Sequence, residues 1–451
     1  MSFFPLTTRS PEHYSRKCSE RLSFAMQLKL AIHPITGIRF GDTTSIAGRT
    51  LVVDAEELRR LILADPSIER VEFEIVCPGE SCRAGPVFDI IEPRAKGADS
   101  SPDFPGVLGP PQTAGMGTTH VLAGTAVTVL KETGAGDSRG APGYVLEMSG
   151  GPAAGTKYAS LHHVIVIPCT KPGLPGHAQQ KAYRLAGLKS AVYMARAAVN
   201  EIPASTESFE PVGFLAAARN GLPRVAYIGQ IFSRQRKPEL GEQILYGAST
   251  DGMLPVVLHP DEWLDGALLP SYHNSLGGVE TYFYQNHPVI GELYRRHHAR
   301  ELDFVGTVAT IAAADNFDRE RNCRFAANLV RWSLNADAAV LTKFGGGVPH
   351  ADLAETARLL EGMGIKTAVQ VTDLARDHRL ESALLFNFPE VNAIVCIGGN
   401  STTWEAPRLE RVIAASPEMV ERLRGPFELE AMSVIGVSNQ QGVSRLRAMI
   451  Y

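Results

Sequence analysis

The sequence predicts an α/β protein, with a β-rich N-terminal domain followed by a doubly wound, parallel-sheet C-terminal domain. Three observations indicate this fold class. Short apolar runs interrupted by glycine and proline fill the region after residue 27, as expected of strands joined by turns. Apolar strands alternate with helical segments in the C-terminal region, which is typical of a parallel sheet. The length of 451 residues is enough for several domains.

The pattern divides the chain into four expected parts. They are a polar tail at 1–27, the β-rich domain at 28–158, a middle α/β region at 159–300 and the doubly wound domain at 301–451. The middle region contains a tract at 265–286 that is rich in glycine and aromatic residues and has no clear period. Because such segments make a poor core by themselves, we expect the N-terminal domain and this tract to be ordered by another subunit in an oligomer.

Local pattern predicts each element. Asp54 is placed to cap a helix over 55–63, in which apolar residues recur at helical spacing. Residues 71–76 alternate as a half-buried strand does, and 99–117 is a loop rich in proline and glycine. Further strands are expected at 87–91, 119–122, 162–168, 225–228, 254–258, 303–310, 338–342, 366–371 and 393–397. Further helices are expected at 178–200, 318–334 and 351–363, the last ending at Gly364.

Composition excludes several classes of protein. Hydrophobic residues make up 44% and charged residues 20%, unlike a disordered chain. The net charge of -4 gives no electrostatic reason to expect nucleic acid or an anionic membrane as a partner. No apolar run is long enough to cross a bilayer, and the segment from Met1 to Lys17 lacks the apolar core of a secretory signal. Six scattered cysteines, without disulfide or zinc spacing, favour a reducing, cytoplasmic location and no metal site.

Two glycine-rich loops follow predicted parallel strands. They are Gly345, Gly346 and Gly347, shortly before His350, and Gly398 and Gly399, before Asn400. Ligands of open parallel sheets bind beyond the carboxyl ends of the strands, where glycine lets the backbone approach them closely. Neither loop has a dinucleotide or P-loop motif, so nucleotide binding is not supported. The loops are either tight turns or the lining of a substrate site.

The tract at 265–286 contains a second candidate for chemistry. Ser275 follows Asn274 and is followed shortly by two glycines. A serine hydroxyl in a strained turn can attack the preceding carbonyl and form an ester, and β-elimination followed by hydrolysis then leaves a pyruvoyl group. This carbonyl is an electrophile that condenses with amines. Asn-Ser dipeptides are common, so the pattern alone is a weak signal.

Several short segments occur in the same order as in a known family. They are 38–42, 77–81, 89–94, 104–106, 119–122, 186–193, 222–227, 259–260, 265–267, 286–290, 292–294 and 349–353. Through them the chain resembles the proprotein (alpha/beta) subunit of component B of the glycine, sarcosine and betaine reductases, and more distantly the D-proline reductase proprotein. The tail and roughly the last hundred residues are not matched by motif.

The resemblance implies a subunit of a reductase complex that takes part in reductive cleavage of a C–N or related bond in a small amine or amino acid derivative. It also implies a partner subunit with a redox-active cysteine or selenocysteine. In the family the proprotein cleaves itself, and a cysteine at the cut becomes the pyruvoyl group. That cysteine falls in the segment that matches residues 268–280 here.

This chain departs from the family pattern, because no cysteine lies between Cys169 and Cys323. The serines of the matching segment are Ser271 and Ser275. Two interpretations follow: Ser275 replaces the cysteine, or the chain has lost cleavage and serves as an uncleaved, non-catalytic scaffold and substrate-binding subunit without a pyruvoyl group. The second is chemically reasonable, since betaine has no N–H and cannot form a Schiff base.

We therefore expect one cleft in which the glycine loops and His350 meet the tract. Ser275, Asn274 and His120 are the candidate catalytic residues, His120 because its imidazole can pass a proton to a departing amine near neutral pH. The candidate substrate-binding residues are Glu80, His273, Gly345, Gly346, Gly347, His350, Gly398, Gly399 and Asn400. The alternative for Glu80 and His120 is that they only cap local turns.

Overall fold

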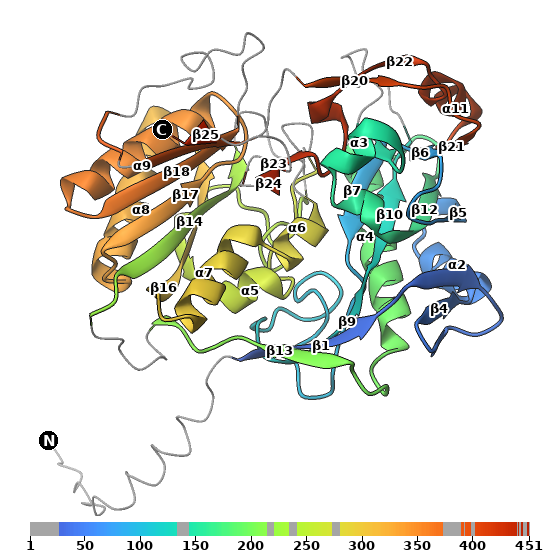
Figure 1. Cartoon of the computed structure of the whole chain (residues 1–451), viewed down its shortest axis with the longest axis horizontal. Helices are drawn as coiled ribbons and strands as arrows, with labels where there is room; N and C mark the ends of the chain where they lie inside the picture. The colour runs from blue at the N-terminus through green and yellow to red at the C-terminus, as the bar shows by residue number, and fades with distance from the viewer. Residues whose placement is uncertain are drawn as a thin grey trace, which may run out of the picture.

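The computed structural model is a mixed α/β protein (Figure 1). It describes residues 27–132, 144–213, 221–233, 241–272, 280–372, 389–391, 393–397, 402–439, 441, 443–444 and 449–450. Strands of the N-terminal region stand beside a sheet built from later strands. Helices α5 (Pro260–Leu264), α6 (Thr281–Gln285) and α7 (Pro288–His298) lie between these two groups of strands.

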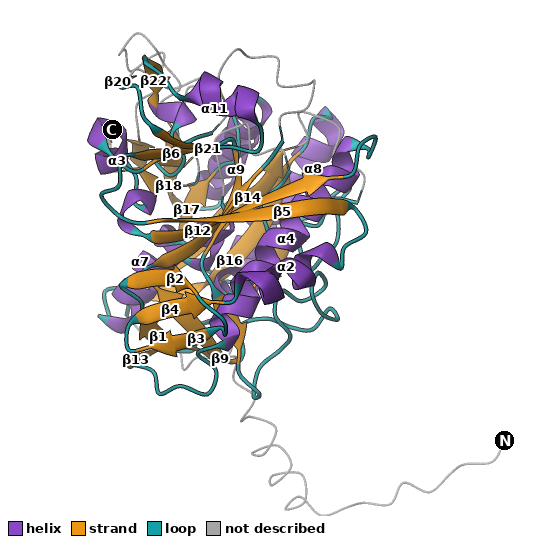
Figure 2. Ribbon diagram, turned by 90° about the vertical axis from the view of Figure 1, so that its right-hand side faces the viewer, coloured by secondary structure: helices purple, strands orange, loops and turns teal. Residues whose placement is uncertain are grey.

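The N-terminal strands form several sheets. One sheet has the order β5 (Ile68–Val76), β12 (His162–Thr170), β10 (Thr125–Leu130), β7 (Val87–Ile91), and another the order β13 (Ser205–Ser208), β1 (Leu28–Pro34), β9 (Gly117–Ala123), β8 (Arg94–Lys96). Small strands β2 (Gly37–Phe40), β3 (Ser45–Ala47) and β4 (Thr50–Val53) pair with one another. Helices α2 (Ala55–Leu63) and α4 (Gly176–Arg196) pack on β5 and β12 and on each other, as Figure 2 shows.

Local pattern predicted this region well. The strands expected at 71–76, 87–91, 119–122 and 162–168 are confirmed. Asp54 is confirmed as the N-cap of α2, because its carboxylate accepts hydrogen bonds from the backbone N–H groups of Glu56 and Glu57, both at 2.9 Å. The apolar residues Leu58 and Ile62, one turn apart, form the buried side of the helix.

The later strands form a mostly parallel sheet. Its order among the described residues is β15 (Val256–Leu258), β16 (Asp303–Ala312), β14 (Arg224–Ser233), β17 (Ala338–Thr342), β18 (Lys366–Thr372), β19 (Ala393–Ile397), β25 (Met449–Ile450). Strands β16, β14, β17, β18 and β19 are parallel, and the edge strands β15 and β25 are antiparallel. Helices α8 (Asn316–Asn328) and α9 (Val348–Gly362) cover one face, and α5, α6 and α7 pack against the other.

The order of this sheet identifies where a ligand would bind. After β14 the chain forms β16 on one side of it, whereas after β17 it forms β18 on the opposite side. The direction of winding therefore reverses between β14 and β17. In open parallel sheets such a switch point is the usual ligand crevice. The loop that follows β17 contains Gly345, Gly346 and Gly347, so this glycine loop lies at the switch point.

Segments from distant parts of the chain share sheets. Strand β12, which follows the expected boundary at residue 158, pairs with β10 and β5, which precede it. Strand β14, which precedes the expected boundary at residue 300, pairs with β16, which follows it. After β19 the chain returns to the N-terminal strands, where β21 (Arg411–Ile413) pairs in parallel with β6 (Cys82–Ala84), which also pairs with β11 (Leu146–Glu147). The remaining elements are α3 (Gly150–Gly155), β20 (Thr403–Ala406), α11 (Pro417–Leu423), β22 (Phe427–Glu430), β23 (Ser438–Asn439) and β24 (Val443–Ser444).

Some expected elements differ in extent. The helix expected at 178–200 ends at Arg196, and the helix expected at 318–334 changes at Leu329 into a π-helical turn that ends at Ser333. The tract at 265–286 contains helix α6, and its residues Leu269 and Tyr272 belong to a core built with N-terminal strands. The described part of the tract is thus buried by the chain itself. Among the described helices, none is both long and apolar enough to span a bilayer.

Gly106 provides a test of the close approach between the loop at 99–117 and the backbone at Tyr246. It has φ +82°, and a Cβ there would overlap the backbone carbonyl of Tyr246. We expect Gly106→Ala to lower the free energy of unfolding by at least about 3 kcal/mol, because it adds steric overlap to left-handed strain. Gly79 is the matched control, since it has φ +84° and nothing within 4 Å of a Cβ. Gly79→Ala should lower the free energy of unfolding by only about 1 kcal/mol, and urea unfolding of both variants measures the difference. Equal effects would contradict the close approach.

Candidate active site

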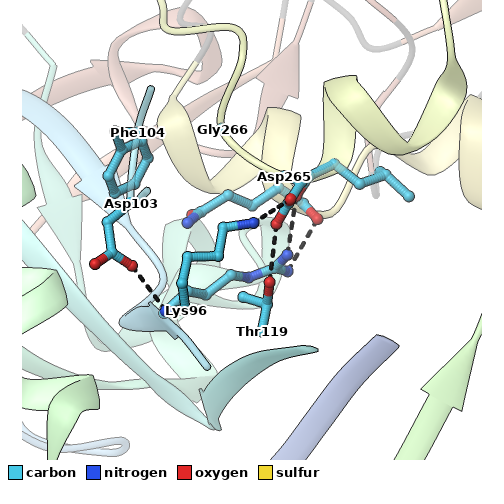
Figure 3. A pocket seen from close by; sticks show the side chains of 9 residues that line it. Lys96, Asp103, Phe104, Thr119, Asp265 and Gly266 are labelled. Carbon is cyan, nitrogen blue, oxygen red and sulfur yellow. Dashed lines mark hydrogen bonds and ion pairs between the residues drawn. The ribbon is translucent and has the colours of Figure 1, made fainter. Parts of the chain in front are cut away.

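A small pocket with charged walls lies where β8, β9 and the loop after α5 meet (Figure 3). Lys96 forms an ion pair with Asp265, whose carboxylate also accepts a hydrogen bond from Thr119 Oγ1 at 3.0 Å. Arg94 pairs with Glu92 at 2.6 Å and donates to the backbone carbonyls of the last residues of α5 and α6, Leu264 and Gln285. All of the side chains just named are buried. The segments 89–94, 119–122 and 265–267, singled out in the sequence, therefore meet here.

This pocket is the place where several segments of the chain are held together by paired charges, and it is too small to be a substrate site. Its volume of about 20 Å³ accommodates little more than a water molecule. Its cations already face carboxylates, so no charge is available for an incoming ligand without breaking a pair. Removing one member of a buried pair leaves the other charge without compensation, which typically costs about 3–5 kcal/mol. The network thus fixes the tract against β8 and β9.

The residues just before the segment 273–279 are held by buried polar groups. Ser271 Oγ donates a hydrogen bond to Glu242 Oε1 at 2.5 Å, and the backbone N–H of Tyr272 donates to the same oxygen at 2.5 Å. Arg184, in the middle of α4, donates from Nη2 to the Pro270 carbonyl at 2.5 Å. Its guanidinium also lies over the ring of Tyr272, 4.8 Å from the centroid. Ser271, Glu242 and Arg184 are 1–2% exposed.

The residues just after the same segment are held in a similar way. Glu280 accepts a hydrogen bond from the Tyr158 hydroxyl at 2.9 Å, and burial raises the pKa of Glu280 to about 7. Asp89 accepts from the backbone N–H of Thr281 at 2.8 Å and from its hydroxyl at 2.6 Å. Burial raises the pKa of Asp89, and the positive charge of Arg184 opposes that rise. The charge of Arg184 therefore acts at both ends of the segment.

A chain of amide contacts joins this region to the glycine loop. The side chain of Gln441 donates to the Gln230 carbonyl at 2.7 Å and lies 3.5 Å from the hydroxyl of Tyr284 in α6. Gln230, on β14, accepts from the backbone N–H of Phe344 at 3.2 Å and donates to the Pro349 carbonyl at 3.0 Å. Gln230 thus holds both ends of the loop that contains Gly345, Gly346 and Gly347.

The glycine loop contains a fully buried lysine. Lys343 Nζ donates to the Gly345 carbonyl at 2.7 Å, and burial lowers the pKa of Lys343 to about 7. His350, also buried, has its pKa lowered to about 3 by burial and by the charge of Lys343. Gly345 and Gly347 have φ +96° and +69°, a backbone conformation that glycine adopts without strain. The loop therefore brings to the switch point an amine that is about half neutral near pH 7.

The candidate residues His120 and Glu80, both from the expected N-terminal domain, have separate partners. His120 Nδ1 lies 3.1 Å from His33 Nε2, and burial lowers the pKa of both rings. Glu80 accepts from the backbone N–H of Cys77 at 3.0 Å, within one turn, and forms an ion pair with Arg411. Neither is among the residues that line the pocket of Figure 3. Their roles in a substrate cleft stay predictions.

The other candidate residues fall outside the described residues. His273, Asn274 and Ser275 lie in 273–279, and Gly398, Gly399 and Asn400 lie in 398–401. The described flanks of these segments are Tyr272 and Glu280 for the first, and Ile397 and Thr402 for the second. Within the described residues, no group of three or more His, Cys, Asp or Glu side chains is arranged to hold a metal ion.

Five buried residues of this region were not expected from the sequence: Arg184, Glu242, Asp89, Glu280 and Lys343. A signal was present for two of them. Arg184 lies at helical spacing with Leu188 and Ala191 on an apolar stripe of α4, and Asp89 interrupts the apolar run of β7. A charge inside a buried pattern needs a partner. The pattern gives no indication of which partner, because Pro270 and Thr281 are remote in sequence.

The low pKa of Lys343 makes a pH-dependent prediction. Between pH 7 and about 10 the unfolded chain binds a proton at this lysine that the folded chain does not bind. The wild-type free energy of unfolding should therefore rise relative to that of Lys343→Met, by at most about 1.4 kcal/mol per pH unit. Urea unfolding of both proteins at pH 7, 8, 9 and 10 measures the difference. Lys366→Met, at an exposed lysine of β18, is the control for loss of charge, and parallel profiles for the wild type and Lys343→Met would contradict the prediction.

Comparison with known proteins gives one consistent result. The family model for glycine/sarcosine/betaine reductase component B subunits matches residues 26–442, well beyond the segments recognised by motif. The glycine reductase complex component B subunits alpha and beta of Acetoanaerobium sticklandii are 29% identical over 442 residues, covering 94% of this chain and 100% of that protein.

Two further relatives come from Peptoclostridium acidaminophilum. The sarcosine reductase complex component B subunit alpha is 30% identical over 443 residues, covering 94% of this chain and 100% of that protein. The betaine reductase complex component B subunit alpha is 30% identical over 421 residues, covering 92% and 90%. No solved structure matches the chain. The chain belongs to the family of glycine, sarcosine and betaine reductase component B subunits.

Proposed function

We propose that this chain is the substrate-binding and catalytic subunit of a reductase complex that cleaves the C–N bond of a small amine or amino acid derivative. The observation that carries the proposal is the family match over residues 26–442, with relatives that are component B subunits of glycine, sarcosine and betaine reductase complexes. The switch point of the parallel sheet supplies a place for the substrate. Arg184, Asp89 and Glu280 supply buried ionisable groups at the flanks of the segment 273–279.

We assign the reactive thiol or selenol to a partner subunit. Thiolates, and not thiols, are the nucleophiles of reductive chemistry. Among the described cysteines, Cys82, Cys169, Cys323 and Cys396 are buried and Cys77 is half-buried. Burial raises the pKa of Cys82 and of Cys323 to about 12, which keeps both protonated. These thiols suit packing, so a redox-active cysteine or selenocysteine on another chain fits the reaction better.

The proposal includes a pyruvoyl group formed from a serine of the tract at 265–286. Such a group supplies an electrophilic carbonyl for an amine substrate. The described residues fit its formation, because a buried serine, Ser271, lies in contact with a carboxylate and follows a carbonyl that faces a guanidinium. Ser275, which the sequence favours for this role, lies outside the described residues.

A second candidate function is that of an uncleaved scaffold that binds substrate for the complex. The absence of a cysteine between Cys169 and Cys323 favours it. The reductive step would then depend on the partner's thiol or selenol alone.

Reconstitution tests the reductase function. A tagged chain is purified from its own host together with its bound partner, and ammonia, methylamine and trimethylamine are measured with glycine, sarcosine and betaine in the presence of a dithiol. We expect amine release from one of these substrates by the complex and none by the isolated chain. Alkylation of the partner should abolish release. A complex that releases no amine from any of the three would contradict the proposal, and release by the isolated chain would contradict the partner's role.

Chain integrity separates the two candidate functions. The processed subunit should run as two fragments on a denaturing gel, and the scaffold as one chain of 451 residues. Cleavage before Ser275 would separate the segment 1–274 from the segment 275–451. If the purified, active complex contains only the full-length chain, the pyruvoyl part of the proposal is wrong and the scaffold function stands.

A further inference from the structure

We propose that Ser271 is the nucleophile that cleaves this chain, that Glu242 is its general base, and that Arg184 stabilises the negative charge that develops on the Pro270 carbonyl. The bond that breaks is the peptide bond between Pro270 and Ser271. This inference rests on the proposed function, in which the new chain end provides the carbonyl for amine chemistry. It names a different serine from the one that the sequence favours, and all four residues lie among those that the structure describes.

The contact between Ser271 and Glu242 is that of a nucleophile and its base. The hydroxyl donates to Glu242 Oε1 at 2.5 Å, a short bond of the kind that a charged acceptor forms. Both residues are almost completely buried, at 2% and 1% exposure. The other carboxylate oxygen, Oε2, has no hydrogen-bond partner among the described residues. A carboxylate that is buried with one oxygen unpaired is costly, so its position calls for a role beyond packing.

Arg184 lies where the reaction needs positive charge. When a serine hydroxyl attacks the carbonyl before it, negative charge builds up on that carbonyl oxygen. Arg184 Nη2 already donates to this oxygen, on Pro270, at 2.5 Å. The guanidinium is held in place by a second bond, from Nη1 to the Gln243 carbonyl at 3.1 Å, and by the ring of Tyr272. A preorganised donor at a developing oxyanion is commonly worth a factor of about 100 to 1,000 in rate.

The steps balance as follows. Ser271 Oγ bonds to the Pro270 carbonyl carbon while Glu242 takes the hydroxyl proton, and the carbon–nitrogen bond breaks as that proton passes to the Ser271 nitrogen. The result is an ester with a free amine. Loss of the Ser271 Cα proton expels the Pro270 carboxylate and leaves a dehydroalanine. One water then hydrolyses its imine tautomer, releasing one ammonia and leaving a pyruvoyl group before Tyr272. No oxidant or reductant is consumed.

A carboxylate that only secures the turn at Ser271 and Tyr272 would make the same contacts. The two roles differ in what happens to the covalent chain. Intact-mass spectrometry of the full-length wild type and four single variants, each expressed whole, measures that difference directly. The variants are Ser271→Ala, Ser271→Cys, Ser275→Ala and Glu242→Gln.

We expect the wild type to give two fragments, 1–270 and 271–451, the second blocked at its N-terminus and reactive with a hydrazide probe. Ser271→Ala should remain one chain without probe reactivity. Ser271→Cys should cleave at the same bond, since a thiol performs the same acyl shift. Ser275→Ala should cleave like the wild type, and Glu242→Gln about 100-fold more slowly. Circular dichroism melting curves like that of the wild type show that the uncleaved variants are folded.

Two results would overturn the proposal. One is a wild-type chain that stays whole during prolonged incubation, and the other is a cut before Ser275, which gives the fragments 1–274 and 275–451. The amine-release assay distinguishes these failures from failure of the proposed function. A whole chain in a complex that still releases amine refutes the role of Ser271 and the pyruvoyl group but leaves the reductase function standing, whereas cleavage at Ser271 in a complex that releases no amine refutes only the reductase function.

Discussion

The burial of one guanidinium, that of Arg184, sets the geometry of the region on which the proposed chemistry depends. A charge in the interior requires compensation, because water no longer solvates it. Arg184 obtains it from the carbonyls of Gln243 and Pro270, from the ring of Tyr272 and from the nearby charge of Asp89. Pro270 and Tyr272 directly precede the segment 273–279, and Asp89 binds Thr281, which follows it. The contacts that compensate the charge of Arg184 therefore also hold the residues on the two flanks of this segment in place.

Other buried charges join parts of the chain that are remote in sequence. Lys96 of β8 pairs with Asp265 in the loop after α5. Arg83 of β6 pairs with Glu147 and donates to the Leu423 carbonyl at 2.5 Å, which ties the returning C-terminal segment to the N-terminal strands. Apolar contacts tolerate small shifts, whereas a paired charge is satisfied in few arrangements. Such pairs give this interior a definite arrangement of its segments.

The glycine loop and the tract belong to one region of the molecule. The loop lies at the switch point of the parallel sheet, and Gln230 and Gln441 connect it to α6, which is part of the tract. The buried amine of Lys343 and the carboxyl of Glu280, each with a pKa near 7, lie on the two sides of this connection. Groups with such pKa values can exchange protons at neutral pH. Under the proposed function, the reactive thiol or selenol comes from a partner subunit.

The sequence by itself determined the α/β class, most of the strands and helices, and the family. Those features depend on local periodicity, as in the capped helix α2, and on short segments in a constant order. Only the tertiary structure decided the pairing of β21 with β6, and of Arg184 with Pro270, because contacts between remote segments follow the path of the chain and leave no local pattern. His120 shows the same limit, since its ring lies against His33 on the neighbouring strand. The candidate roles of His273, Asn274, Ser275, Gly398, Gly399 and Asn400 rest on sequence alone, because these residues lie outside those that the structure describes.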